Sequence, residues 1–325
     1  MANKKADKIS IVGAAGCVGS SIAFNIVQQG LASELMVADI RKDWLEHHAI
    51  DFFDAAVASK IDIRVSMGGY QDLSGSDIVV MAAGVGVTQG VRTSGGQLTS
   101  RQHLLPENLK IVEEWAPAID RYCPRAIVIM VTNPADVLNY AAYLLGSQKE
   151  RPRFIGYALN DTIRFQIALA EALSVAPSRV GATVIGEHGG SMVPLFSSAT
   201  VDGKPVSLSE DVKAKVRERT SDYLPHMLRL NVPRTSGWLT GIGVAKMVSA
   251  IVNDTGAVIH CCAVVDGEYG YKNVSIGLPV ALGRQGVKKI VDLKLTSEEK
   301  RLLDSSVATV RKSIDYVVEQ VGGRR

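Results

Sequence analysis

Residues 8–19 of the 325-residue chain read KISIVGAAGCVG, and this stretch decides the fold. The residues before the first glycine are mostly apolar and β-favouring, which predicts a buried strand over 8–12. Three glycines then open a helix expected over 17–29: Gly13, Gly16 and Gly19. Glycine allows a positive φ, lets the backbone approach a pyrophosphate, and lets the helix pack close to the strand. The N-terminus of such a helix attracts phosphate. Alone, a glycine-rich turn of this kind could also be a tight turn and nothing more.

An acidic residue ends the next predicted strand. Asp39 follows the apolar run 34–38, about 20 residues after the glycine turn, where an acid hydrogen-bonds the adenosine ribose of a dinucleotide. A carboxylate there repels a 2′-phosphate, so NAD is expected rather than NADP. Arg41 and Lys42 follow at once and could soften that repulsion. The other readings of Asp39 are a helix N-cap and a solvated strand end.

Strand-like and helix-like segments alternate over the first half of the chain. The runs 77–83 and 126–131 are continuously apolar, as is typical of strands covered on both faces. The elements expected there are strands over 8–12, 34–38, 77–83 and 126–131, and helices over 17–29 and 44–59. This alternation predicts an α/β fold with a Rossmann-type, doubly wound parallel sheet.

The pattern changes near residue 150. Residues 180–185 and 197–206 look like strands around an Asp202-Gly203 turn, and 258–291 carries three further runs. Antiparallel strands mixed with helices indicate an α+β unit. We therefore expect a Rossmann NAD-binding domain over 1–150 and a substrate-binding, catalytic domain over 151–325.

The last helix is the clearest single element. Thr296 and Glu299 have the spacing of a capping box. Behind them, apolar residues recur at steps of three and four and predict one core-facing stripe. The stripe consists of Leu303, Val307, Val310, Ile314, Val317 and Val321.

Composition excludes several classes of protein. A net charge of +3 with scattered basic pairs does not favour a nucleic-acid partner. No apolar run is long enough to span a bilayer, and the polar start is unlike a secretory signal. The four cysteines lack C-x-x-C spacing, so we expect reduced thiols, no metal site and a cytoplasmic location.

Two short segments carry side chains suited to acid–base and anion chemistry. Asp161 and Arg164 are three residues apart and would share one helix face. His188 lies among glycines after a predicted strand, which leaves an imidazole accessible. Each could be structural by itself, because an Asp–Arg pair is more often a surface ion pair and a lone histidine a satisfied polar residue.

Eight features together resemble the L-lactate/malate dehydrogenase family, in its order and near its spacing, from about residue 8 to about residue 315. They are GAAGCVG (13–19), Asp39, RQHLLPEN (101–108), VTNPADV (131–137), DTIR (161–164), IGEHG (185–189), GEYG (267–270) and LPVALGRQGV (278–287). The resemblance implies hydride transfer between the nicotinamide of NAD and the hydroxyl-bearing carbon of a small L-2-hydroxy acid.

The resemblance also implies residue roles. His188 would be the general acid/base and Asp161 would hold its ring. Arg164 would grip the substrate carboxylate with a two-pronged hydrogen bond. Arg101 would polarise the substrate carbonyl from a closing lid, and Asn133 would hydrogen-bond the substrate oxygen. The implied cofactor contacts are Gly13, Gly16, Cys17, Val18, Gly19, Asp39, Gly84, Asn108, Val131 and Asn133. Tyrosine–lysine chemistry is excluded, since none of the nine tyrosines has a lysine four residues later.

The lid departs from the family pattern. Sixteen residues separate Gly84 from Arg101, more than the family usually has. Malate-specific relatives carry a second arginine six residues before the catalytic one, where this chain has Gly95. Arg92 could take that role and bind a distal carboxylate, or it could be a solvated loop residue.

Two further positions indicate a reshaped substrate pocket. Asn160 stands where the family normally has an apolar residue, and Trp238 lies close to where relatives place a small side chain. The GAAG turn and Arg92 favour malate and oxaloacetate as substrate and product. The longer lid and Asn160 favour lactate or a bulkier or more polar 2-hydroxy acid. A non-catalytic NAD-binding sensor or scaffold is the remote alternative.

The apolar helix 44–59 suits burial between subunits, so a homodimer or homotetramer is expected.

Overall fold

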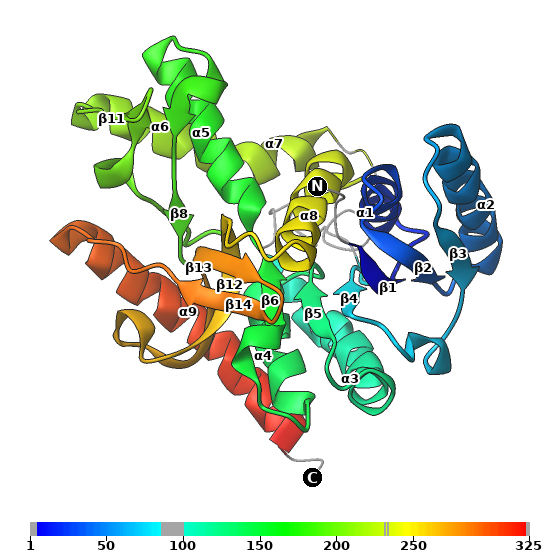
Figure 1. Cartoon of the computed structure of the whole chain (residues 1–325). Helices are drawn as coiled ribbons and strands as arrows, with labels where there is room; N and C mark the ends of the chain where they lie inside the picture. Colours follow the sequence, from blue (N-terminus) through cyan, green and yellow to red (C-terminus); the bar gives the residue numbers. More distant parts are fainter. Residues whose placement is uncertain (1–4, 86–100, 231, 233, 323–325) are drawn as a thin grey trace.

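The computed structural model describes residues 5–85, 101–230, 232 and 234–322. A nine-stranded sheet runs through it in the order β14-β13-β12-β6-β5-β4-β1-β2-β3 (Figure 1). The strands are β1 (Ala6–Val12), β2 (Ala32–Ala38), β3 (Arg64–Met67), β4 (Ile78–Met81), β5 (Ile127–Met130), β6 (Phe154–Tyr157), β12 (Val258–Asp266), β13 (Lys272–Gly283) and β14 (Gly286–Ile290). Strands β1 to β6 pair in parallel, which confirms the predicted doubly wound sheet.

The helices are α1 (Cys17–Gln28), α2 (Lys42–Ala58), α3 (Leu105–Tyr122), α4 (Ala135–Leu145), α5 (Leu159–Leu173), α6 (Glu210–Ser221), α7 (Tyr223–Arg229), α8 (Gly237–Val252) and α9 (Ser297–Gly322). Helix α6 packs mainly against α5 and α7, and other helices cover the faces of the sheet. Every residue of β4 and β5 is buried, as the continuous apolar runs 77–83 and 126–131 predict. A strand covered by helices on both faces is apolar on both faces, so its apolar residues are consecutive and do not alternate with polar ones.

The antiparallel strands of the second half join the same sheet. β12 pairs with β6 in antiparallel register, from Cys261 opposite Tyr157 to Ala263 opposite Ile155, and β13 and β14 follow. β6 itself comes after residue 150 but pairs in parallel with β5. The division of the chain at residue 150 stays a prediction, and the hydrogen bonding of the sheet is continuous across it.

A smaller unit stands apart in the upper left of Figure 1, where α5 and α6 pack beside short strands. These strands are β7 (Val180–Gly181), β10 (Thr200–Val201) and β11 (Lys204–Pro205), which form a three-stranded sheet. The strands β8 (Val184–Ile185) and β9 (Val193–Pro194) pair with each other and contact β13 and α9. The strand expected over 197–206 is wrong in extent: residues 196–198 form a 3-10 helix, and only two short strands flank the turn. Asp202 and Gly203 both have positive φ, so the chain reverses sharply there.

Helix α9 has the predicted capping box and stripe. The Thr296 backbone N donates to Glu299 Oε2 at 2.9 Å, and the Glu299 backbone N donates to Thr296 Oγ1 at 3.2 Å. Glu299 also accepts from the hydroxyl of Ser197 at 2.8 Å, so the box ties the helix to the loop after β9. All six stripe residues are buried.

We expect Glu299→Ala to lower the free energy of unfolding by about 1–3 kcal/mol, because the carboxylate accepts several hydrogen bonds in a buried setting. Burial alone would raise the pKa of Glu299, but hydrogen bonds from Thr296 and Ser197 outweigh it and hold the pKa below 4.5. A carboxyl with a lowered pKa stabilises the fold above its unfolded-state value, and this stabilisation is lost as the pH falls through the folded-state value.

Urea unfolding at several pH values measures the difference in the free energy of unfolding between the wild type and Glu299→Ala. Glu298→Ala is the control, since Glu298 neighbours Glu299 but is exposed and makes one long ion pair with Arg217 at 3.6 Å. The decrease in the free energy of unfolding caused by Glu299→Ala should have its full size at neutral pH and become smaller below pH 4.5. A loss that is equal in both variants, or independent of pH, would contradict the assignment.

Candidate active site

The glycine turn lies at the carboxyl end of β1, between β2 and β4, where the strand order reverses. Gly13 has a φ of +92°, and a Cβ there would lie 2.3 Å from the backbone N of Ala83, so only glycine fits. At Gly16 the tightest contact of a Cβ would be 3.2 Å, so packing constrains this residue less. Gly16 is the N-cap of α1 and provides no side-chain cap. The first turn, Cys17 to Gly19, therefore presents its N–H groups at a place where open α/β sheets bind ligands.

Asp39 lies directly beside this turn. Its Oδ2 accepts a hydrogen bond from Ala15 N at 3.0 Å, and its Oδ1 accepts from Arg41 N at 3.0 Å. The side chain is only 7% exposed, and the N-cap of α2 is Arg41, so neither alternative reading of Asp39 matches the structure. A carboxylate has about four acceptor sites, so two backbone hydrogen bonds leave capacity for a ribose diol. Arg41 Nε lies 3.4 Å from Oδ1 and offsets part of the charge.

The ends of β4 and β5 bring together four of the predicted cofactor residues: Gly84, Asn108, Val131 and Asn133. Asn108 is buried, accepts from Val85 N at 2.7 Å, and donates to the Asn133 carbonyl at 2.7 Å. Its amide thus joins the start of the lid to the loop after β5. Asn133 Oδ1 is buried and has no hydrogen-bond partner among the described residues. Such an orphaned acceptor fits a ligand that supplies a donor.

The structure brings His188, Asp161 and Arg164 into contact. His188 Nδ1 lies 2.5 Å from Asp161 Oδ2, and Arg164 Nη1 lies 3.1 Å from Asp161 Oδ1. All three side chains are at least nine-tenths buried, so the Asp–Arg pair on α5 is not a surface ion pair. An ionised carboxylate only accepts hydrogen bonds, so Nδ1 carries a proton and Nε2 is the nitrogen that exchanges one.

The guanidinium of Arg164 stacks on the ring of Tyr223. The guanidinium carbon of Arg164 lies 3.7 Å from the ring centroid of Tyr223, and the Tyr223 hydroxyl bonds Ser236 Oγ at 2.6 Å. Arg164 Nε is buried and lacks a partner among the described residues. A buried, stacked guanidinium with an unused donor is suited to a carboxylate ligand.

The Asn160 amide has the partners that a buried amide needs. Tyr157 donates its hydroxyl to Asn160 Oδ1 at 2.6 Å, and Asn160 Nδ2 donates to Thr240 Oγ1 at 3.1 Å. Trp238 lies at the start of α8, is 67% exposed, and stacks against Arg234 at 4.2 Å. The substrate contacts of both residues stay predictions.

The lid is described only at its end. Arg92 lies outside the described residues. Arg101 begins a short 3-10 helix, Arg101–Leu104, that leads into α3. Arg101 therefore lies just before the start of α3, the helix that carries Asn108.

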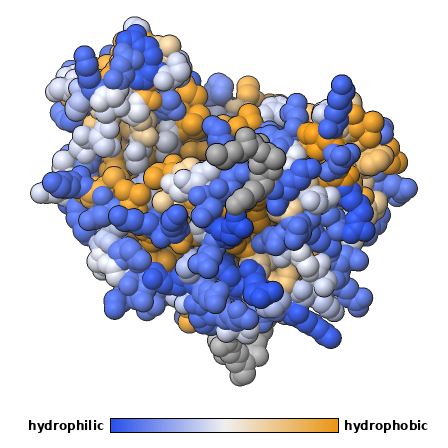
Figure 2. Space-filling view, viewed as in Figure 1, coloured by the Kyte–Doolittle hydropathy of each residue, from blue (hydrophilic) through white to orange (hydrophobic). Residues whose placement is uncertain are grey.

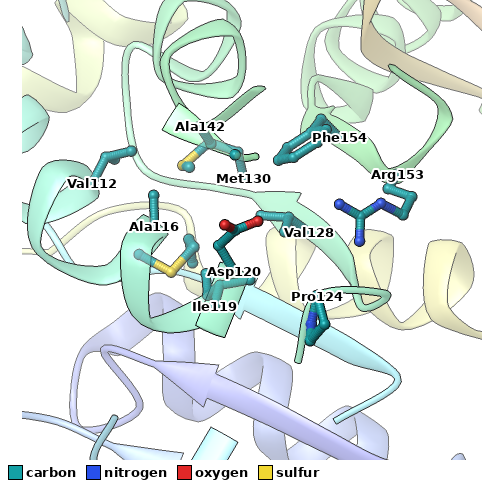
Figure 3. A pocket seen from close by; sticks show the side chains of 12 residues that line it. Val112, Ala116, Ile119, Asp120, Pro124, Val128, Met130, Ala142, Arg153 and Phe154 are labelled. Carbon is teal, nitrogen blue, oxygen red and sulfur yellow. The ribbon is translucent and has the colours of Figure 1, made fainter. Parts of the chain in front are cut away.

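Two hollows lie away from these residues. A small apolar cavity of about 20 Å³ lies between α3, β5 and β6, with Val128, Met130 and Phe154 in its wall (Figure 3). A cleft of about 1250 Å³ opens at the amino ends of β1, β4 and β5. No predicted site residue lines either hollow. Side-chain chemistry at the carboxyl ends of the strands therefore identifies the site better than the size of a cavity does.

Sequence reasoning missed Asp136 and Tyr223. Asp136 is buried on α4, and its Oδ2 accepts a hydrogen bond from the backbone N of His188 at 2.8 Å. A lone acid in the apolar stretch 134–145 was the available signal, because an acid there must find a partner. Tyr223 is one of nine tyrosines, and no local pattern marks it.

Comparisons with known proteins show the family of the chain. Residues 7–156 match the family model of the lactate/malate dehydrogenase NAD binding domain, and 159–321 match that of the lactate/malate dehydrogenase alpha/beta C-terminal domain. A malate dehydrogenase of Nitratiruptor sp. is 35% identical over 320 residues, which are 97% of this chain and 98% of the relative. L-lactate dehydrogenase 1 of Clostridium acetobutylicum is 32% identical over 324 residues, 97% and 99% of the two chains.

A solved structure is similar over nearly the whole chain. Lactate dehydrogenase from Cryptosporidium parvum, complexed with lactic acid and NAD, superposes with a TM-score of 0.88 at 28% identity. The match covers 98% of this chain and 99% of that one.

The fold and these matches define an NAD-binding α/β oxidoreductase. The chain belongs to the lactate/malate dehydrogenase family. It is an NAD-dependent 2-hydroxy acid dehydrogenase. None of the described helices is both long and apolar enough to cross a membrane.

We expect NADH to be preferred over NADPH, and Asp39→Ser to narrow that preference. The substitution removes the charge that repels a 2′-phosphate and frees Arg41 to attract it. The measurement is kcat/KM for both cofactors with one fixed 2-oxo acid. Asp43→Ser, an exposed acid in the first turn of α2, is the control and should leave the ratio unchanged. Equal kcat/KM for the two cofactors in the unmodified enzyme would rule out this role of Asp39.

Proposed function

We propose that the enzyme interconverts a small L-2-hydroxy acid and its 2-oxo acid, with malate and oxaloacetate ahead of other pairs, and that His188 is the acid/base. The observation that carries the proposal is the buried contact of His188 with Asp161, which also pairs with Arg164. This arrangement supplies a titrating imidazole and a cation for the substrate carboxylate in one place.

The glycine turn fits NAD on two observations: the uncapped first turn of α1 and the partly unused carboxylate of Asp39. Gly13, Gly16 and the first turn, Cys17, Val18 and Gly19, would hold the pyrophosphate, and Asp39 the adenosine ribose. When bound, NAD supplies the hydride donor or acceptor of the reaction.

The protein's own groups handle the proton and the charge. During oxidation of the hydroxy acid, His188 Nε2 takes the hydroxyl proton while Asp161 stabilises the imidazolium that forms. During reduction, the same nitrogen returns the proton to the substrate oxygen. Arg164 holds the carboxylate, and Arg101 and Asn133 donate to the oxygen that changes between hydroxyl and carbonyl.

The preference for malate rests on the GAAG turn and on Arg92. The relatives include enzymes named as malate dehydrogenases and as lactate dehydrogenases at similar identity, so they favour neither substrate. The longer lid and Asn160 keep lactate or a bulkier or more polar 2-hydroxy acid as the second candidate. A non-catalytic scaffold is disfavoured, because it has no physical need for the buried group of His188, Asp161 and Arg164.

We also propose a homodimer or homotetramer in the cytoplasm. Apolar side chains on the outer face of α2 are about half or more exposed: Trp44, Ile50, Phe53 and Val57. The hydrophobic colour over α2 at the right of Figure 2 agrees with a face suited to burial against another subunit. All four cysteines are free, which supports a reducing compartment.

We expect His188→Ala to lose kcat by roughly 10²- to 10⁴-fold while NADH still binds, because acid–base catalysis is removed and the glycine turn is untouched. Steady-state turnover and fluorescence titration with NADH measure the two effects. His47→Ala, an exposed histidine on α2, is the matched control. A His188→Ala enzyme that keeps more than about a tenth of wild-type kcat would remove His188 from the mechanism.

Substitutions of Arg92 and of Arg101 should affect kcat/KM for oxaloacetate and pyruvate differently. If Arg92 binds a distal carboxylate, Arg92→Ala removes a charge-assisted hydrogen bond of roughly 1.5–3 kcal/mol. Oxaloacetate should then lose on the order of 10- to 100-fold in kcat/KM, and pyruvate little. Arg101→Ala should slow both substrates, since it acts on the carbonyl that they share. Equal losses for oxaloacetate and pyruvate in Arg92→Ala would defeat the malate assignment.

A further inference from the structure

Two buried carboxylates contact His188, one at its ring and the other at its backbone. Asp161 on α5 contacts the ring at Nδ1, 2.5 Å away, and Asp136 on α4 accepts a hydrogen bond from the peptide N at 2.8 Å. Asp136 is 1% exposed. Its second oxygen, Oδ1, is also buried and lacks a hydrogen bond of good geometry within the described part of the chain. A carboxyl so completely buried needs a physical reason to be there.

The surroundings of Asp136 are acidic. Asp161 has Arg164 as its cation, at 3.1 Å. Glu187 accepts from the backbone N and hydroxyl of Ser191, at 2.9 Å and 2.5 Å. Asp136 forms no salt bridge with the lysines and arginines that the structure describes. The imidazolium of the mechanism forms on His188, the residue whose peptide N donates to Asp136.

The titratable groups that face Asp136 come from three elements. They are Cys262 on β12, Glu187 and His188 in the loop after β8, and Asp161 on α5. His188 also faces the buried imidazole of His260 on β12, whose pKa it helps to lower. Burial raises the pKa of Asp136 to about 7; the neighbouring Cys262 thiol and the hydrogen bond from His188 N oppose the rise, and Glu187 and Asp161 add to it. Asp136 thus changes charge in the range in which a histidine does.

We propose that Asp136 is a positioning residue of the reaction: it fixes the backbone of His188 from behind, and its negative charge favours the imidazolium form of that histidine. The inference rests on the proposed role of His188. Two interacting groups that titrate near the same pH share their protons, so the pH dependence belongs to the pair and not to His188 alone.

Asp136→Asn separates the two parts of this role. The amide oxygen still accepts from His188 N, but the charge is gone. The alkaline limb of kcat for reduction of the 2-oxo acid, where His188 loses its proton, should move to lower pH by about one unit. The plateau kcat at lower pH should stay within about threefold of wild type, whereas Asp136→Ala, which leaves the peptide N unsatisfied, should lose tenfold or more.

Cys262→Ser should act in the opposite direction. A hydroxyl of nearly the same size donates a stronger hydrogen bond to the carboxylate than a thiol does and favours its ionised form. The alkaline limb should therefore move to higher pH. Asp315→Asn, an exposed acid on α9, is the control and should leave the limb in place.

An NMR titration of the His188 ring tests the inference without measuring turnover. The chain has six histidines, and the signal lost in His188→Gln identifies the ring of His188. Its midpoint should fall in Asp136→Asn and rise in Cys262→Ser. NADH binding and a cooperative unfolding transition show that each variant is folded. If Asp136→Asn does not fold, the rise in Cys262→Ser decides the question.

The outcomes keep the two claims apart. Unchanged His188 midpoints in the folded variants would overturn the inference even if the enzyme turns over 2-oxo acids through His188. Shifted midpoints with no turnover of any 2-oxo acid would support the inference and overturn the proposed function.

Discussion

The close approach of the β1–α1 turn to the end of β4 is the constraint on which the rest of the structure depends. Gly13 N and Ala14 N both donate to the Ala38 carbonyl, and Ala82 N donates to Val12 O at 2.8 Å. The ends of β1, β2 and β4 are therefore fixed to one another at the point where the strand order reverses. The candidate cofactor residues of the glycine turn, Asp39 and Gly84 follow these strand ends directly. A Cβ at Gly13 would push the turn away from β4 and disturb all of them together.

The second constraint is electrostatic. Asp136, Asp161, Glu187, Arg164 and His188 are all buried or nearly so, and burying charge is costly unless the charges are paired and hydrogen-bonded. A structure selected for stability alone would hold apolar side chains there. Residues that break the rule for buried charge usually do so for function. The sheet supports this group, since α4 and α5 pack against it and Gly186 in the loop after β8 pairs with Gly277 on β13.

The C-terminal helix supports this group as well. Ser306 on α9 accepts from Glu187 N at 2.8 Å and lies 3.1 Å from Ser191 Oγ. Gly186 pairs with Gly277 on β13 through backbone hydrogen bonds of 2.9 Å and 3.0 Å. The loop that carries His188 is thus held by α4, α9 and β13. Three elements far apart in the sequence therefore hold the backbone of this loop, and Asp161 on α5 holds the imidazole ring.

Local sequence patterns determined the elements of this protein and only part of its site. The apolar runs, the glycine turn and the Thr296–Glu299 capping box each depend on residues close in the chain, so their physical causes can be read from the sequence. The spacing of Asp161 and Arg164 also predicted their shared helix face. Their burial, and their contact with His188, 27 residues from Asp161, required the fold.

Tertiary structure alone decided the rest. No local pattern connects Asp136 to His188, which lie 52 residues apart, or Tyr223 to Arg164. The joining of β12–β14 to the parallel sheet and the break of the strand expected over 197–206 depended on neighbours that the sequence does not place. Periodicity reports which face of an element is apolar, whereas the partner of that face is set by packing between segments that meet only in the folded chain.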